Sequence, residues 1–168
     1  MTTAWVARVG LPLEPDEESA VLDLMRIVAP HAAGAITALG SWQEAAACVR
    51  AGERDSMVWD QEEEEREALW ARATEQRTED EVLRQLDVGI RGLDVEMRVA
   101  VLAAMGGAGV VDAELATEAT GMALLAAHQS ALALLAGAGP DHRFVRKNAL
   151  FTRGRWPLGY HSARFAIF

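Results

Sequence analysis

The sequence predicts a mainly α-helical protein, a bundle of five or six helices with a small β-element. Apolar residues recur at helical spacing over most of residues 14–138, and capping signals precede several of these stretches. After Pro140 the period changes, and aromatic residues alternate with other residues as they do in strands. A chain of 168 residues fits one domain. We expect a helical body at about 14–138 and a basic, aromatic hairpin region at about 140–168.

The first elements are a short strand and one or two helices. Ala4 to Val9 is rich in tryptophan and valine, which favours a strand. Pro15 is followed by three acids, a composition typical of the first turn of a helix, and Pro30 ends that helix. The stretch from Pro30 to Leu39 is interpreted as a further short helix, the sixth of the bundle.

The next two helices differ in their polarity. Ser41 and Glu44 form a capping box, which begins a helix that runs to about Ala51. The stretch from Ser56 to Glu75 is predicted as the most polar helix. It has few large apolar residues with which to pack, namely Met57, Val58, Trp59, Leu69 and Trp70.

Two longer helices complete the predicted body. Thr78 and Glu81 form a second capping box, which opens a long helix with a regular apolar stripe. Gly89 and Gly92 are expected inside that helix, where they would allow a close helix crossing. Asp112 caps a final helix that runs to about residue 136 and is predicted to be the most buried.

The C-terminal residues are predicted to form a β-hairpin of strands 155–160 and 164–168. Pro157 cannot donate a ladder hydrogen bond, so its strand should lie at an edge. A hairpin alone is marginally stable in water, and the predicted strand Ala4–Val9 is a possible third partner for it. Such pairing would bring the two termini together.

Charge is distributed unevenly along the chain, which carries a net −9. Residues 53–81 contain twelve acids and four bases, a net −8, whereas residues 140–168 contain one acid and six bases, a net +5. The overall acidity disfavours nucleic acid as a partner and favours a basic protein. No apolar stretch is long and charge-free enough to predict a membrane span, so no membrane partner is expected.

Neither a catalytic centre nor a metal or cofactor site is predicted. Glu118 and His128 are ten residues apart on one helix, about 15 Å, which is too far for them to share an ion. The only cysteine, Cys48, is interpreted as a small buried apolar residue, and its lack of a disulfide partner favours a cytoplasmic location. The sequence thus favours a non-enzymatic role over an enzyme.

The basic residues after Pro140 alternate with aromatic ones, and three interpretations remain open for them. They pair with the acidic segment of the same molecule, they contact a partner protein, or they bind nucleic acid or a phosphorylated ligand. The first is favoured because it requires no partner and explains the opposite charges.

The leading functional hypothesis is a protein–protein interaction module, an inhibitor or immunity-like partner of a basic protein. Its acidic helix would steer association electrostatically, and two tryptophans eleven residues apart would anchor the contact. The predicted partner-binding residues are Trp59, Glu62, Glu63, Glu64, Glu65 and Trp70.

Two alternatives to this hypothesis are retained. One is a small enzyme or ligand-binding protein with a pocket between the helical body and the hairpin, lined by His142, Arg155, Tyr160 and His161. The other is a subunit of a larger assembly or a homo-oligomer, in which the aromatic tail inserts into a neighbouring chain.

Overall fold

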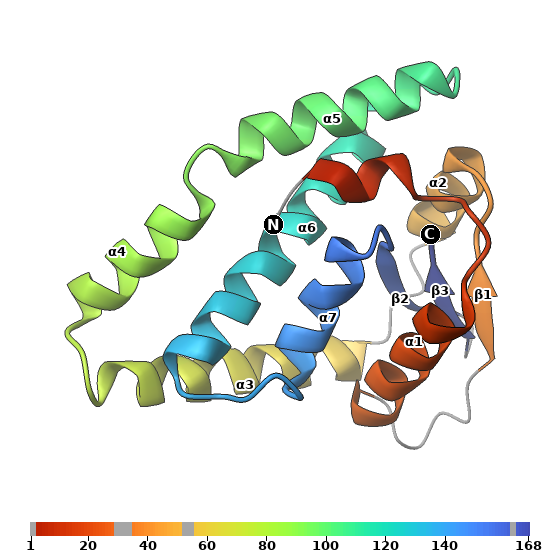
Figure 1. Ribbon diagram of the computed structural model, residues 1–168. Coiled ribbons are helices and arrows are strands. Elements are labelled where there is room, and N and C mark those ends of the chain that lie inside the picture. The colour runs from red at the N-terminus through yellow and green to blue at the C-terminus, as the bar shows by residue number, and fades with distance from the viewer. Residues whose placement is uncertain (1–2, 29–34, 52–55, 162–163) are drawn as a thin grey trace.

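The structure, a computed structural model, describes residues 3–28, 35–51, 56–161 and 164–168 (Figure 1). These residues form a 3₁₀ helix, seven α-helices and three strands. In chain order they are η1 (Thr3–Ala7), α1 (Pro15–Val28), β1 (Ile36–Ala38), α2 (Trp42–Ala51), α3 (Ser56–Thr74), α4 (Glu79–Ile90), α5 (Leu93–Gly107), α6 (Ala113–Leu135), α7 (Arg143–Thr152), β2 (Pro157–His161) and β3 (Arg164–Ile167).

Helix α6 runs through the middle of the molecule and contacts α3, α4, α5 and α7 (Figure 1). Helices α3, α4 and α5 follow one another around the outside, and the small sheet lies at the end away from α4. The long central helix agrees with the sequence, because its alanines at Ala119, Ala123, Ala126 and Ala133 are almost completely buried and let neighbouring helices approach. The mainly α-helical class with a small β-element is therefore confirmed.

The helices differ from the prediction at three places, one of which is the predicted helix at Pro30–Leu39, where strand β1 forms instead. The helix predicted to start at Thr78 is two helices, because Gly92 adopts a left-handed conformation with φ of 87° and separates α4 from α5. Helix α7 was not predicted. The sequence showed only its alternating basic and aromatic residues, although Phe144, Lys147 and Leu150 lie one helical turn apart and are all buried.

The third strand of the sheet is β1 and not the N-terminal segment. The predicted strand at Ala4–Val9 was wrong. The predicted helix at Pro30–Leu39 was also wrong, because Ile36–Ala38 form β1, and residues 30–34 of that prediction lie outside the described part. The N-terminal segment forms η1 because Trp5, 1% exposed, inserts between α5 and α7. Its indole N–H donates to the sulfur of Met97 at 2.8 Å, and its ring meets Phe151 edge-on.

The C-terminal hairpin is confirmed, with β3 in the centre of the sheet. Strand β1 pairs with β3 in parallel, and β2 pairs with β3 antiparallel. Strand β2 is at an edge of the sheet, as Pro157 requires, and its register shifts between Pro157 and Gly159.

Alternation along the hairpin buries both faces of the sheet in the same chain. Tyr160, Phe165 and Ile167 pack against α1, whereas Trp156 and Phe168 pack with α2, α5 and α6. Phe168 meets the Trp42 ring edge-on at 4.9 Å between centroids. The aromatic tail is therefore part of this molecule's own core.

The capping signals are confirmed at Thr78 and Asp112. The Thr78 hydroxyl accepts from the Glu81 N–H while the Glu81 carboxylate accepts from the Thr78 N–H, and the Asp112 carboxylate accepts from the Leu115 N–H at the start of α6. At Ser41 half of the predicted box forms, because the Ser41 hydroxyl accepts from the Glu44 N–H. In the described part of the chain, no helix is both long and apolar enough to cross a membrane.

Candidate functional site

The basic residues of the C-terminal region pair with acids of the same molecule, starting with Arg155. Its guanidinium, 2% exposed, donates to the Leu11 and Pro12 carbonyls and, at 2.5 Å, to the Glu17 carboxylate. Glu17 is 3% exposed and also accepts from the Glu14 N–H at 2.9 Å. The pair therefore fixes the start of the hairpin to the N-terminal segment and to α1.

This pairing keeps Glu17 ionised. Burial by itself raises the pKa of the Glu17 carboxyl. The hydrogen bonds from Arg155 and from the Glu14 backbone, together with the charges of Arg155 and Arg8, outweigh burial and hold that pKa below its usual value of 4.5.

The inner side of α3 carries a second buried ion pair. The Lys147 ammonium donates to both carboxylate oxygens of Glu62, at 2.8 and 3.1 Å. The Gln129 amide of α6 lies 3.4 Å from the same carboxylate. Glu62 and Lys147 are each 8% exposed, so α3, α6 and α7 meet at a polar contact closed to most of the solvent.

Glu65, one turn further along α3, holds the N-terminus of α7. Its two oxygens lie 2.8 Å from His142 Nε2 and 2.7 Å from Arg143 Nε. His142 is the N-cap of α7, and its Nδ1 accepts from the Phe144 N–H, which assigns the remaining proton to Nε2. The predicted pairing of C-terminal bases with the acidic segment is therefore confirmed, although the bases belong to α7 rather than to the hairpin.

The remaining acids of α3 point to solvent and form what we call the acidic face: Asp60, Glu63, Glu64 and Glu67. Arg66 is half-buried among them and forms an ion pair with Glu63. The helical period thus places the four consecutive glutamates, predicted as one binding surface, on two sides of α3. Glu62 and Glu65 face α7, and Glu63 and Glu64 face solvent.

The two tryptophans predicted as anchors lie on the same edge of α3, because eleven residues are about three turns. Trp59 is 53% exposed, an unusual state for so large an apolar side chain, whereas Trp70 is half-buried and packs against the cluster around Leu69 and Phe144. Of the two, only Trp59 offers most of its ring to a partner.

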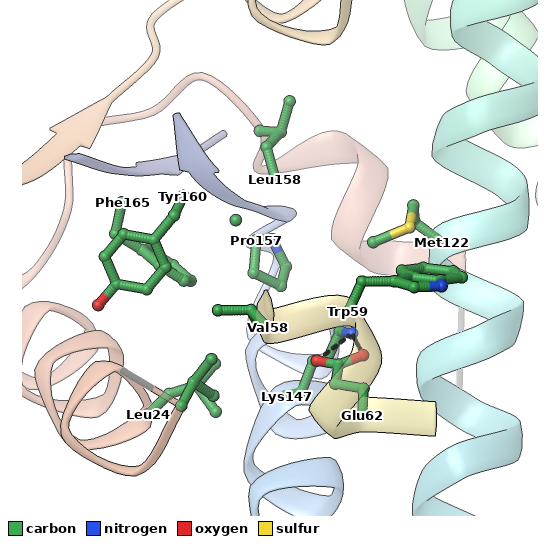
Figure 2. A pocket seen from close by; sticks show the side chains of 12 residues that line it. Leu24, Val58, Trp59, Glu62, Met122, Lys147, Pro157, Leu158, Tyr160 and Phe165 are labelled. Atoms are coloured by element: carbon green, nitrogen blue, oxygen red, sulfur yellow. Dashed lines mark hydrogen bonds and ion pairs between the residues drawn. The ribbon is translucent and has the colours of Figure 1, made fainter. Parts of the chain in front are cut away.

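A groove opens beside Trp59, between α1, α3, α6, α7 and the C-terminal hairpin (Figure 2). Its volume is about 80 Å³, several times the ~10–15 Å³ that one water needs. In Figure 2, Val58 points into its centre, and the bonded Glu62 and Lys147 lie beside Trp59 at its lower edge. Its other apolar lining comes mainly from Leu24, Val28, Met122, Pro157, Leu158 and Phe165.

The four residues predicted to line a pocket are not gathered at this groove. Tyr160 lines it, but Arg155 is held by Glu17 and His142 by Glu65 and the α7 backbone. His161 ends β2, and its side chain lies outside the described part.

Sequence reasoning missed Val58 and Lys147 as groove residues. A usable signal existed for Lys147, because it occupies the inward position of the stripe Phe144, Lys147, Leu150. No comparable signal existed for Val58, whose role depends on the hairpin, about 100 residues later in the chain, packing opposite it.

The other candidate residues show no reactive arrangement. His128 is half-buried beside α3, and burial, with a smaller contribution from the Arg66 charge, lowers its pKa below 6.5, so it is neutral at pH 7. Among the described residues, no group of three or more His, Cys, Asp or Glu side chains is placed to hold a metal ion.

Comparisons with protein-family models, with curated proteins and with solved structures find no match to this chain. The α3 surface and its groove are therefore the features that indicate a function.

Proposed function

We propose that this protein is a non-enzymatic interaction module that binds a basic protein through the acidic face of α3. The observation that supports this most strongly is the division of the acidic run. Glu62 and Glu65 are engaged by α7, but Asp60, Glu63, Glu64 and Glu67 remain exposed in less than three turns of one helix.

The acidic face destabilises α3 in the isolated protein. Like charges three and four residues apart destabilise a helix by about 0.2–0.5 kcal/mol per pair, and Arg66 offsets only part of this. A partner rich in lysine and arginine would relieve the repulsion and would be steered to the surface before contact. The half-exposed Trp59 beside the acids would supply apolar contact area.

An inhibitor or immunity-like role would follow if the bound face covered the working site of the partner. Because Cys48 is the only cysteine, no internal disulfide is available to the chain, and we propose a cytoplasmic setting.

The test is affinity capture from the native cells at low salt, with elution at high salt. The protein is compared with a triple variant of the acidic face, Asp60→Asn/Glu64→Gln/Glu67→Gln. Glu63 is left unchanged because it pairs with Arg66. We expect a basic protein to elute from the wild type and to be lost from the triple variant.

The matched control neutralises three exposed acids on other helices, Glu18→Gln/Asp94→Asn/Glu96→Gln. It changes the net charge by the same amount, so it should retain the partner. Equal loss from both variants would mean that total charge rather than the acidic face attracts the protein, and equal retention would remove the acidic face from consideration.

A second candidate function is the binding of an apolar molecule about the size of one side chain in the groove, which is favoured by its largely apolar lining. A neutral ligand of that size, such as toluene, tests it by isothermal titration calorimetry. Saturable binding that Val58→Phe abolishes would support this function, and a signal that the variant leaves unchanged would contradict it.

A further inference from the structure

The groove and the acidic face adjoin at Trp59. Trp59 lines the groove and is 53% exposed at its edge. Asp60 is the next residue of α3, and Glu63 follows one turn later on the same edge as Trp59. A partner that covers Trp59 can therefore contact these two acids and also reach the groove.

The chemistry of the groove differs from that of the acidic face. Among the residues that the structure describes, the charged ones lining the groove are Glu62 and Lys147, and these neutralise each other through two hydrogen bonds. A charged group entering the groove would lose its hydration without finding an unpaired opposite charge. An uncharged apolar group instead meets Val58, Met122 and Phe165.

The size of the groove limits its occupant. About 80 Å³ exceeds the requirement of a single water several-fold but is much smaller than the ~300–1,000 Å³ of common small-molecule pockets. One large aliphatic or aromatic side chain is a better match than a whole cofactor.

On the basis of the function proposed above, we infer that the groove receives one large apolar side chain of the basic partner. The lysine or arginine neighbours of that side chain would then lie over Asp60 and Glu63, the acids next to Trp59. The recognised feature is an apolar residue flanked by basic residues, and a purely basic surface would be bound more weakly.

Synthetic pentapeptides test this preference on the intact protein. The probe is acetyl-Lys-Arg-Leu-Arg-Lys-amide. One analogue has alanine at the centre, and another has glutamate at all four flanking positions. Binding is followed by the indole N–H resonance of Trp59 in ¹H–¹⁵N NMR spectra, assigned by its loss in Trp59→Phe. Leucine has three more side-chain carbons than alanine, and each contributes roughly fourfold when fully buried. We therefore expect the alanine analogue to bind at least about tenfold more weakly, and about sixtyfold more weakly if the leucine is completely buried.

A variant that fills the groove separates apolar anchoring from charge attraction. Val58→Phe places extra atoms where Val58 points into the groove, and Val88→Phe makes the same change at an exposed position on α4. We expect Val58→Phe to reduce binding of the leucine peptide to the level of the alanine analogue, and Val88→Phe to leave it unchanged. Trp59→Ala, at a half-exposed position, provides a second groove variant if Val58→Phe does not fold. Because this variant lacks the reporting indole, its peptide binding is measured by isothermal titration calorimetry beside the wild type.

Two results would overturn the inference in distinguishable ways. Equal, salt-sensitive binding of the leucine and alanine peptides would remove the anchor and leave the acidic face as the contact surface. If the leucine peptide and its acidic analogue bound equally well and both were blocked by Val58→Phe, the groove would be a general apolar site and the proposed function itself would fail. Absence of binding by any peptide at about 1 mM also overturns the inference.

Discussion

Replacing Lys147 by methionine should destabilise the protein strongly. Lys147→Met removes the ammonium from a pair whose members are each 8% exposed and leaves the Glu62 carboxylate with the Gln129 amide at 3.4 Å. Removing one member of a buried ion pair costs about 3–5 kcal/mol. Because the pair borders an open groove, we expect the lower end, about 3 kcal/mol, or a fall in Tm of about 6–12 °C for a chain of this size.

The double variant Glu62→Leu/Lys147→Met distinguishes loss of the pair from loss of packing. Replacing a buried ion pair by apolar residues of similar volume is often neutral or stabilising, so the double variant should recover to within about 1 kcal/mol of the wild type. Glu64→Gln, on the exposed side of the same helix, should change stability by less than about 0.5 kcal/mol.

Urea unfolding followed by circular dichroism measures all three variants, and the slope of the free energy against urea must stay constant for the comparison. Two outcomes would refute the division of α3 into a structural and an exposed side. One is a Lys147→Met protein within 0.5 kcal/mol of the wild type, and the other is a Glu64→Gln protein as unstable as Lys147→Met.

Three other changes probe the rest of the molecule. Glu17→Gln should destabilise the protein at pH 7. Because the folded-state pKa of Glu17 lies below 4.5, the difference in stability from the wild type should shrink as pH falls through that lowered pKa. A stability difference that stays constant in urea titrations from pH 7 to 3 would contradict this. Gly154→Ala should lower the free energy of unfolding by about 2 kcal/mol or more, because Gly154 has φ of 88° and the new Cβ would lie 2.4 Å from Arg8 Cβ. An unchanged Tm would show that Gly154 and Arg8 are not packed in this way. His128→Gln should reduce the loss of stability on acidification below pH 6.5. In the wild type, His128 binds a proton more readily in the unfolded state than in the folded state, where burial lowers its pKa. Identical dependence of stability on pH in the variant and the wild type would exclude this role.

Local signals in the sequence were reliable for this protein. The capping boxes at Ser41 and Thr78 and the cap at Asp112 each begin a helix at the expected place. In the first of these, the Glu44 carboxylate accepts from the Gly40 N–H rather than from Ser41. Such signals depend on residues three or four positions apart, which is why they can be read without the fold.

Elements that depend on distant partners were not predictable. Strand β1 has three residues, and its pairing partner Phe165 is more than 120 residues away. The segment around Trp5 resembled a strand in composition, but it folds as a 3₁₀ helix because burial of one indole between α5 and α7 decides its conformation. In both cases tertiary packing outweighs local propensity.

The candidate site was predictable only in outline. Charge alone indicated that the C-terminal bases would pair with the acidic helix, and Glu62 and Glu65 do so. The choice of those two glutamates over Glu63 and Glu64 depends on the orientation of α3 against α7, which the sequence of α3 does not specify. The groove depends on the hairpin packing beside α3 and α6, so its lining was even less accessible to sequence reasoning.

The central claim is that the acidic face of α3 is the surface that meets a basic partner. Site-specific photo-crosslinking in the native cells tests this most directly, with the crosslinking residue at position 64 on α3 and, as the control, at the equally acidic and exposed position 96 on α5. A discrete crosslink to a basic protein from position 64, absent from position 96, is the predicted result. Crosslinks of equal yield from both positions, or from position 96 alone, would contradict the claim.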